Sequence, residues 1–412
     1  MIFMNKNRHS QGGFALLIVT MSISIIAIVI HIFVFRTKKE LRATYAVAEK
    51  EKARYIAFST LEITKLFLKV QAKYIDSNPM MANMGIDMGQ ILPMIMPMFF
   101  GDGAMVTMMI GTEVEGLGLK KGQGTGGIES FKSEDGKINL NCAIGASNVA
   151  QLSAILMALL NDRRYDELFQ RNLKDAGMMD RMQQVASIID YIDIDQSGMG
   201  ANGGDEDSYY KGLNEPYESK NNLLDSTEEI RLIKGIDEIF WTNFGKSFTV
   251  YGSCKINLCS VDPDNWQLIA GLIIASAKNP ADQVVTDPVK LKKLASTIGP
   301  QMMGICRDAN MFAQAVQNPG VAGGLIASSM GVSVDSMSDL GNDGVSDSEV
   351  QGVELDSAKL QALIEKTPKR FYRIKGFGVA GKTRSEIEVV WDQMAINQAT
   401  GKIGSFVYWK EE

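Results

Sequence analysis

The sequence predicts an α+β fold: a long N-terminal helix crosses a membrane and packs on an antiparallel sheet, with a large all-α domain inserted between the strands. Three observations support this prediction. Residues 14–35 carry no charged side chain and are mostly apolar. Strand-like alternation occurs around residues 124–140 and again beyond residue 368, whereas the residues in between follow a helical period.

The apolar run 14–35 has the length of a membrane span. Its 22 residues are enough for a helix to cross a hydrocarbon core of roughly 30 Å. No proline occurs between Phe14 and Asn78, and a helical spacing continues beyond Arg36. The residues at this spacing are Leu41, Tyr45, Ala48, Tyr55, Leu66 and Val70. We therefore expect one continuous helix, with residues 14–35 in the membrane and residues 36–72 outside it, packed on a globular domain.

The short segment before the span indicates how the helix is processed. Gly12 and Gly13 end a polar leader, residues 1–13, immediately before the apolar run. A secretory signal would instead place small residues after the run. The arrangement resembles the leader of type IV prepilins, which implies cleavage between Gly13 and Phe14 by prepilin peptidase and N-methylation of Phe14. A plain membrane anchor with a chance pair of glycines is the alternative.

Composition argues against several functions. With 45% apolar and 22% charged residues, the 412-residue chain has ample material for a folded core. The net charge of −6 argues against nucleic-acid binding, which needs clustered Lys and Arg. His9 and His31 are the only histidines, so residues 36–412 offer neither a His-based zinc site nor a His general base. The scarcity of histidine therefore argues against the commonest hydrolase chemistries.

The cysteines leave several arrangements open. Cys142, Cys254, Cys259 and Cys306 lack C-x-x-C spacing, so neither a zinc knuckle nor a redox pair is indicated. In an oxidising compartment they can form two disulfides, in one of three pairings that the sequence does not distinguish. Buried free thiols are the alternative.

The remainder of the chain divides into three parts. Residues 73–141 contain a methionine-rich segment, 79–110, and the first strands of the sheet. Methionine fills apolar surfaces more often than it binds copper(I), so we expect core or partner contacts in this segment. Residues 142–367 form the inserted α-domain, with a mobile surface loop at 328–352, and residues 368–412 supply the last strands.

The inserted domain contains an internal repeat of one short motif. "KINLN" at residues 137–141 recurs as "KINLC" at residues 255–259, and helical patterns begin shortly afterwards, near Asn148 and Asn265. We therefore expect two related helical subdomains. Between them, two short helices joined at Gly235 resemble a helix-hairpin-helix unit. Such a unit can grip DNA phosphates through its amides, but acidic surroundings favour packing against protein.

Residues 190–210, "DYIDIDQSGMGANGGDEDSYY", form the candidate site. The glycines of this loop would let its carboxylates curl around a hard cation, which prefers oxygen ligands. Asp193 and Asp195 begin an EF-hand-like pattern, which lacks the Glu that closes such a loop at its twelfth position. We predict a calcium loop of different closure, with Asp193, Asp195, Glu206 and Asp207 as ligands. A solvated acidic loop is the alternative.

Several separated stretches together resemble one family, the type II secretion system minor pseudopilin K, also called general secretion pathway protein K. They are "GGFALLIV" at the leader junction, "EDGKINLN" from Glu134, "IIDYIDID" and "DEDSYY" around the acidic loop, "STEEIRLIKGI" from Ser226, and "KINLC". The resemblance implies a pilin-like fold whose inserted α-domain has two SAM-like or helix-hairpin-helix subdomains. It also implies calcium at the acidic loop, where Glu206 and Asp207 match the family pattern best.

The function that the resemblance implies is mechanical, so we expect a protein that is not an enzyme. The chain would be a single-pass inner-membrane subunit with a periplasmic domain, capping the tip of a pseudopilus and nucleating its assembly for export of folded proteins across the outer membrane. Its partners would be other minor pseudopilins, the major pseudopilin, prepilin peptidase and the inner-membrane assembly platform. Ile18 replaces the Glu that pilin-like subunits usually carry at the fifth mature position, as suits a subunit at the tip. The alternatives are a membrane-anchored metal-dependent enzyme and a DNA-binding or DNA-uptake protein.

Overall fold

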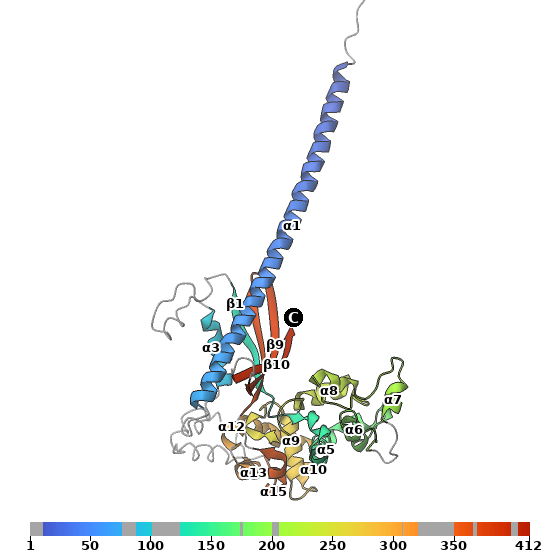
Figure 1. Cartoon of the computed structure of the whole chain (residues 1–412), viewed down its shortest axis with the longest axis vertical. Coiled ribbons are helices and arrows are strands. Elements are labelled where there is room, and N and C mark those ends of the chain that lie inside the picture. Colours follow the sequence, from blue (N-terminus) through green and yellow to red (C-terminus); the bar gives the residue numbers. More distant parts are fainter. Residues whose placement is uncertain are drawn as a thin grey trace, which may run out of the picture.

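The computed structural model describes residues 11–75, 88–100, 124–173, 176–199, 206–306, 308–319, 350–365, 369–396 and 403–412. Figure 1 shows a long helix whose lower part lies against a small sheet, with a group of shorter helices at the end remote from the helix N-terminus. This arrangement is the predicted α+β fold. Most of the predicted leader, of the methionine-rich segment and of the loop 328–352 lies outside the described residues.

Helix α1 spans Gln11–Val70 and continues as one π-helical turn, Gln71–Ile75, which confirms the predicted continuous helix. Among the described residues, Gly13–Tyr74 is the one helix long and apolar enough to cross a membrane; its most apolar window has a mean hydropathy of 2.7 and is not buried. Hydroxyl groups in this window bond within the helix, as when Ser22 Oγ donates to the Ile18 carbonyl oxygen at 2.8 Å. Such bonds make polar side chains tolerable in lipid.

The lower half of α1 packs on the sheet through a narrow face of small and apolar side chains. These are Ala53, Ile56, Ala57, Thr60, Leu61, Thr64 and Leu68. The periodic residues that predicted the helix lie elsewhere, because Tyr45, Tyr55 and Leu66 are 63%, 68% and 61% exposed. The helix is therefore as predicted, but this larger apolar stripe is not the face that packs on the globular domain.

The sheet has four antiparallel strands in the order β1, β8, β9, β10. The strands are β1 (Thr125–Ser133), β8 (Phe371–Ala380), β9 (Thr383–Ile396) and β10 (Ile403–Glu411). Gly381, with a φ of +59°, lies in the predicted turn between β8 and β9. Helix α3 (Met88–Phe99) places Leu92 and Met96 in a buried cluster with α1 and β1, so this part of the methionine-rich segment fills the core.

A glycine in β8 lets α1 approach the sheet closely. A Cβ atom on Gly378 would lie 2.1 Å from the Ala53 carbonyl oxygen and 2.6 Å from the Ala57 nitrogen. Only glycine therefore permits the observed contact between the helix backbone and the strand. The contact fixes the position of α1 over the sheet.

The helical domain is inserted between two neighbouring strands. The chain leaves the sheet after β1 and returns at β8, where Ser133 pairs with Tyr372. The insertion is therefore present as predicted, and its boundaries lie slightly outside residues 142–367. Its two halves share one hydrophobic core.

Each half of the insertion closes with a short parallel strand pair. The pairs are β2 (Ile138–Asn139) with β5 (Phe248–Thr249), and β6 (Ile256–Asn257) with β7 (Ile364–Glu365). The repeated motif supplies the first strand of each pair. Its asparagines, Asn139 and Asn257, then cap the 3-10 helices that follow, accepting hydrogen bonds from the backbone nitrogens of Asn141 and Cys259. The predicted repeat thus has the same local structure in both halves.

The first half contains helices and short strands between β2 and β5. They are η2 (Leu140–Ile144), α5 (Ala146–Leu160), η3 (Arg163–Gln170), β3 (Asn172–Leu173), β4 (Gly177–Met178), α6 (Arg181–Asp190), α7 (Asp207–Lys211), η4 (Thr227–Leu232), α8 (Glu238–Phe244) and η5 (Gly245–Ser247). The second half is helical between β6 and β7. Its described helices are η6 (Leu258–Ser260), α9 (Trp266–Ser276), α10 (Gln283–Thr286), α11 (Pro288–Ile298), η7 (Gly299–Gln301), α12 (Met302–Ile305), α13 (Ala309–Gln317) and α15 (Ser357–Leu363).

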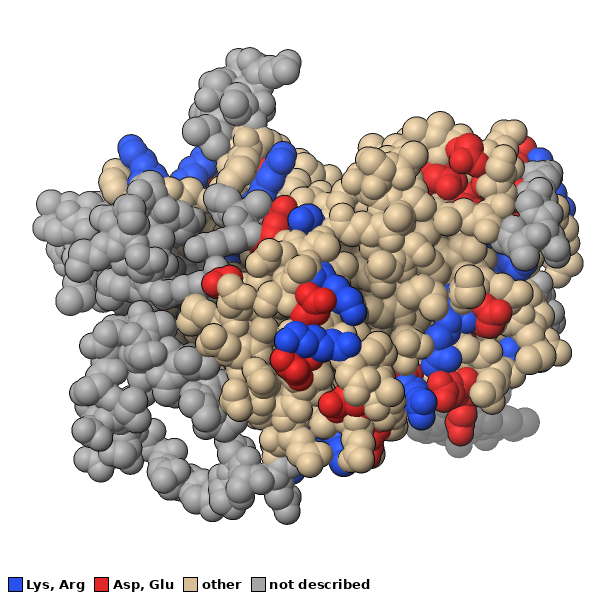
Figure 2. Space-filling view, turned by 90° about the horizontal axis from the view of Figure 1, so that it is seen from below, with Lys and Arg blue, Asp and Glu red and all other residues tan. Residues whose placement is uncertain are grey.

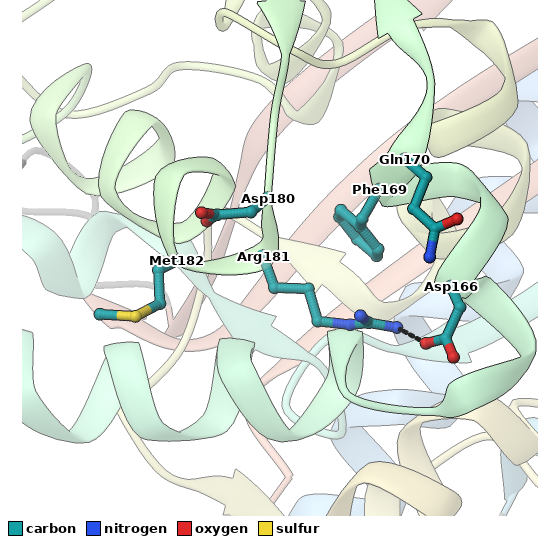
Figure 3. Close-up of a pocket in the computed structure, with 6 residues that line it drawn as sticks. All are labelled: Asp166, Phe169, Gln170, Asp180, Arg181 and Met182. Atoms are coloured by element: carbon teal, nitrogen blue, oxygen red, sulfur yellow. Dashed lines mark hydrogen bonds and ion pairs between the residues drawn. The ribbon is translucent and has the colours of Figure 1, made fainter.

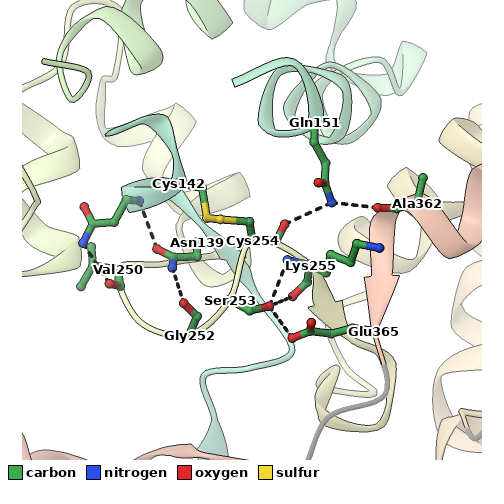
Figure 4. The surroundings of a disulfide bond; sticks show 11 residues. Asn139, Cys142, Gln151, Val250, Gly252, Ser253, Cys254, Lys255, Ala362 and Glu365 are labelled. Carbon is green, nitrogen blue, oxygen red and sulfur yellow. Dashed lines mark hydrogen bonds between the residues drawn. A yellow bond between two sulfur atoms is a disulfide. The ribbon is translucent and has the colours of Figure 1, made fainter. Parts of the chain in front are cut away.

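Two disulfides connect these parts. Cys142 pairs with Cys254 and Cys259 pairs with Cys306, with Cα–Cα distances of 5.5 and 4.9 Å. The first bond joins the start of the first half to the start of the second, as Figure 4 shows. Beside it, Gln151 Nε2 donates to the Ala362 carbonyl oxygen at 2.8 Å, so a helix of the first half also contacts the end of the second.

Candidate functional site

The predicted processing junction lies at the start of α1. Gly13 has no neighbouring atom within 4 Å of an added Cβ, and Phe14 is 68% exposed. The backbone around this glycine is therefore open to solvent or lipid among the described residues. Cleavage and methylation at Phe14 stay predictions.

The acidic loop begins where α6 ends. A capping box of Asp180 and Gln183 starts this helix, and its last turn runs into a tight bend in which Asp193 N donates to the Ile189 carbonyl oxygen at 2.9 Å. Asp193 and Asp195 meet Glu206, which precedes α7, with one carboxylate oxygen from each within 4.8 Å of the others.

Three carboxylate oxygens of this cluster are buried without a protein partner. Asp193 Oδ1 and both Glu206 oxygens have no hydrogen-bond donor among the described residues. Burial, then the charges of Asp195 and Asp190, raise the pKa of Asp193 to about 6. Burial, then the neighbouring carboxylates led by Asp193, raise the pKa of Glu206 to about 8. The chain has therefore gathered negative charge that its own described side chains do not neutralise.

Asp207, the fourth predicted ligand, points elsewhere. Its Oδ1 accepts hydrogen bonds from Ser219 N and Ser219 Oγ at 2.8 and 2.6 Å, and its Oδ2 accepts one from Lys211 Nζ at 3.0 Å. The Ser219 hydroxyl and amide, followed by Lys211, lower the pKa of Asp207 to about 2. The structure thus separates neighbouring acids: Glu206 turns to the cluster, while Asp207 ties α7 to the segment that follows it.

One acid near the cluster was not among the predicted ligands. Asp190 accepts a hydrogen bond from Met199 N at 2.9 Å, which holds Met199 against the end of α6. Burial raises its pKa, against the effect of that hydrogen bond. The only feature of the sequence that could have pointed to Asp190 was its position as the first carboxylate of the acidic run.

The residues present fit a hard divalent cation. Ca²⁺ takes carboxylate oxygens as ligands, in numbers and angles that vary from site to site, and Asp193 and Glu206 offer buried oxygens without a donor among the described residues. The cluster contains no His or Cys, which zinc and copper sites usually use. Asp193, Asp195 and Glu206 would hold the ion, and a hollow of about 230 Å³ lined in part by Asp193, Ile194 and Asp195 lies beside them.

The hairpin at Gly235 faces the protein interior. Lys234 N donates to Tyr210 Oη at 3.3 Å, and the Lys234 carbonyl oxygen accepts from Gln184 Nε2 at 3.0 Å. A Cβ on Gly235, whose φ is +84°, would lie 2.4 Å from Gln184 Oε1. These contacts favour packing against protein over a grip on phosphates. Figure 2 agrees for the face it shows, where basic and acidic side chains are interspersed among the described residues.

A larger hollow, of about 380 Å³, lies between η3 and α6 (Figure 3). Arg181 crosses it, donating to the Leu160 carbonyl oxygen at 2.7 Å and to Asp166 Oδ1 at 2.6 Å, with its guanidinium 4.7 Å from the Phe169 ring centre. Asp180, at its edge, caps α6. The charged groups of this hollow are thus engaged in holding α5, η3 and α6 together.

The fold defines a class: a membrane-anchored protein whose N-terminal helix packs on an antiparallel sheet that carries an inserted helical domain. Residues 136–252 match the model of the family described as Type II secretion system (T2SS), protein K. Type II secretion system protein K of Aeromonas hydrophila is 24% identical over 269 residues, which cover 64% of this chain and 71% of that protein. These matches confirm the resemblance to type II secretion system protein K that the sequence shows.

A solved structure is also similar. It is a chain of the crystal structure of the GspK-GspI-GspJ complex from the type 2 secretion system of enterotoxigenic Escherichia coli. The two chains have a TM-score of 0.47 and 14% sequence identity, with 92% of this chain and 99% of that chain covered.

Proposed function

We propose that this chain is the tip subunit of a pseudopilus, a minor pseudopilin that nucleates fibre assembly with other minor pseudopilins. The fibre would serve the export of folded proteins across the outer membrane. The position of the inserted domain carries the proposal. It is attached at the end of the sheet that lies away from the membrane half of α1, as Figure 1 shows.

This position has a steric consequence. Subunits of a pilin-like fibre stack with their α1 helices roughly along the axis, so the next subunit ahead would need the space that the helical insertion fills. A second copy of this chain could not repeat the stacking. One end of the fibre is therefore the place where the insertion obstructs nothing.

The exposed stripe on α1 supports contacts with other subunits. Tyr45, Tyr55 and Leu66 lie on the face opposite the sheet and are more than half exposed. Apolar side chains at this spacing fit the helix of a neighbouring pilin-like subunit. We place the other minor pseudopilins on this stripe, with the major pseudopilin following behind them in the fibre.

The N-terminal residues suit the same role. Prepilin peptidase would release Phe14 as the N-methylated terminus, and the assembly platform would draw the span out of the inner membrane while the globular domain stays in the periplasm. Ile18 offers no carboxylate to a subunit ahead, and a subunit at the tip has none ahead of it. An unpaired Glu at this depth would be costly in lipid.

The test is the position of this chain in assembled fibres. Fibres are isolated from cells expressing an epitope-tagged full-length chain and labelled with gold-conjugated antibody. We expect label at one end of each fibre. Label distributed along the fibre length would overturn the tip assignment, and intact Met1 in the isolated chain would overturn the processing.

We also propose that the acidic cluster binds calcium. Asp193, Asp195 and Glu206 would hold the ion, and its charge would offset the repulsion among these carboxylates. In this way calcium would rigidify the loop between α6 and α7. Isothermal titration of the metal-free chain with calcium should show binding that Asp193→Asn abolishes; equal binding by this variant would overturn the site.

A further inference from the structure

The junction between the sheet and the inserted domain contains a buried acid with several cationic and polar partners. Glu134, the first residue after β1, is fully buried. Its Oε1 accepts hydrogen bonds from Arg373 Nε at 2.8 Å and Lys137 Nζ at 2.6 Å, and its Oε2 accepts one from Thr249 Oγ1 at 2.5 Å. These donors come from β8, from the outgoing connection and from β5 of the first half.

The next residue joins the outgoing and returning connections. Asp135 Oδ2 accepts hydrogen bonds from the backbone nitrogens of Arg370 and Phe371, at 2.7 and 2.9 Å. The backbone carbonyl oxygen of Asp135 accepts one from Asn257 N at 2.8 Å. This one residue therefore touches the return of the chain to the sheet and the second half of the insertion.

Neighbouring contacts leave little room for movement at this point. A Cβ on Gly136 would lie 2.1 Å from the Ser260 carbonyl oxygen, so the connection passes directly against the second half. Lys132 Nζ lies 2.5 Å from Asp262 Oδ2, and the rings of Tyr251 and Phe371 stack at 5.8 Å. All three contacts cross from the sheet or its connections to the inserted domain.

A domain joined to a sheet by only two connecting segments would ordinarily be free to reorient relative to the sheet, because single chain segments bend easily. Here both crossings are bonded to each other and to both halves of the domain. We propose that Glu134 and Asp135 act as a clasp that fixes the orientation of the inserted domain on the sheet. A push applied along α1 is then transmitted to the far end of the molecule without bending at the junction.

The proposal is tested on the full-length chain in detergent, with spin-labelled unnatural amino acids at Val289 on α11 and Lys382 in the β8–β9 turn. Both positions are exposed, and the native disulfides stay intact. Double electron–electron resonance measures the distance between the labels. We expect a single narrow distance in the unsubstituted chain and loss of that single distance in Glu134→Ala and Asp135→Ala.

The matched control is Glu129→Gln on the same sheet. Glu129 forms exposed ion pairs with Lys375 and Arg384 and has no contact with the inserted domain among its ion pairs. This variant should keep the single distance. If the alanine variants do not fold, Thr249→Val removes one hydrogen bond from Glu134 and should still widen the distance distribution.

Three results would overturn the clasp. They are a broad distribution in the unsubstituted chain, an unchanged narrow distribution in folded Glu134→Ala and Asp135→Ala, and equal broadening in the Glu129→Gln control. None of these results depends on where the chain sits in a fibre, so the clasp and the tip assignment can fail separately.

Discussion

Glu134 and Glu206 are two glutamates with buried carboxylates in opposite surroundings. Glu134 has Arg373, Lys137 and Thr249 around it, and although burial alone would raise its pKa, Lys137 and Arg373 lower it. Glu206 has other carboxylates around it and no donor among the described residues, and its pKa is raised to about 8. The same side chain is thus neutralised by the protein in one place and not in the other.

The difference indicates what each region needs from outside. The junction at Glu134 is complete in itself, so its geometry should not depend on ions in solution. The loop at Glu206 is incomplete as an isolated polypeptide, because buried like charges favour either protonation or a bound cation. Measurements on both glutamates and their neighbours can break or sharpen this contrast.

The largest expected effect comes from Glu134→Gln. This variant leaves Arg373 and Lys137 without their shared buried counter-charge, and breaking one partner of such a group costs about 3–5 kcal/mol. Chemical denaturation measures the loss in the free energy of unfolding. Glu129→Gln, which removes half-exposed ion pairs on the same sheet, should cost at most about 1 kcal/mol; equal losses would contradict the contrast.

The loss of stability caused by Glu134→Gln should also depend on pH. A folded-state pKa below the ordinary value of 4.5 adds stability above that pH, and the contribution is lost as the pH falls through the lowered value. The stability difference between the unsubstituted chain and Glu134→Gln should therefore shrink in acid. A difference that grew below pH 4.5 would show that the pKa is not lowered.

Removing calcium should have the second-largest effect on stability. A ligand present at 100 times its dissociation constant stabilises the folded state by about 2.7 kcal/mol, so chelation should lower the free energy of unfolding by about that amount. Hydrogen exchange should quicken in residues 190–211 and stay unchanged at 133–137. Faster exchange at the junction as well would mean that the two regions are not independent.

The effect of Glu206→Gln on stability should change sign when calcium is added. Without the ion, at a pH above the raised Glu206 pKa of about 8, the substitution removes one of several repelling charges. A unit-charge contact at about 4 Å is worth roughly 1 kcal/mol in water, so thermal stability should rise slightly. With the ion it removes a ligand, so stability should fall below that of the unsubstituted chain. A loss of stability in both conditions would show that Glu206 is not repelled by its neighbours.

Asp207→Asn should have the smallest effect, because it should leave calcium binding almost unchanged. Its carboxylate is engaged by Ser219 and Lys211 and not by the cluster, so calorimetry should give a dissociation constant close to that of the unsubstituted chain. Asp193→Asn is the matched comparison and should lose binding. If both variants lose binding equally, Asp207 turns toward the ion when calcium is present.

The sequence predicted the features that are strongly periodic or strongly charged. The proline-free stretch after Phe14 predicted α1, alternation around Gly381 predicted β8 and β9, and the density of acids predicted that Asp193, Asp195 and Glu206 would meet. The motif at residues 137–141 and 255–259 predicted two related halves. Each of these predictions rests on a pattern to which several residues contribute.

Other features depend on contacts that no local pattern contains. The adjacent Glu206 and Asp207 differ only in where the turn into α7 directs them. The face of α1 that packs on the sheet uses small residues such as Ala53, whose period is weaker than that of the exposed stripe. Glu134 and Asp135 did not stand out as a junction in the sequence, because several of their partners, such as Arg373, lie more than two hundred positions away.

The order of the disulfides has a consequence for biogenesis. Cys142 joins Cys254 and Cys259 joins Cys306, so each cysteine bonds its immediate partner along the chain. Cys259 follows Cys254 by only five positions, whereas Cys306 emerges much later. When the domain enters an oxidising compartment N-terminus first, the order of emergence therefore disfavours the pairing of Cys142 with Cys306, and each bond that forms needs an oxidant.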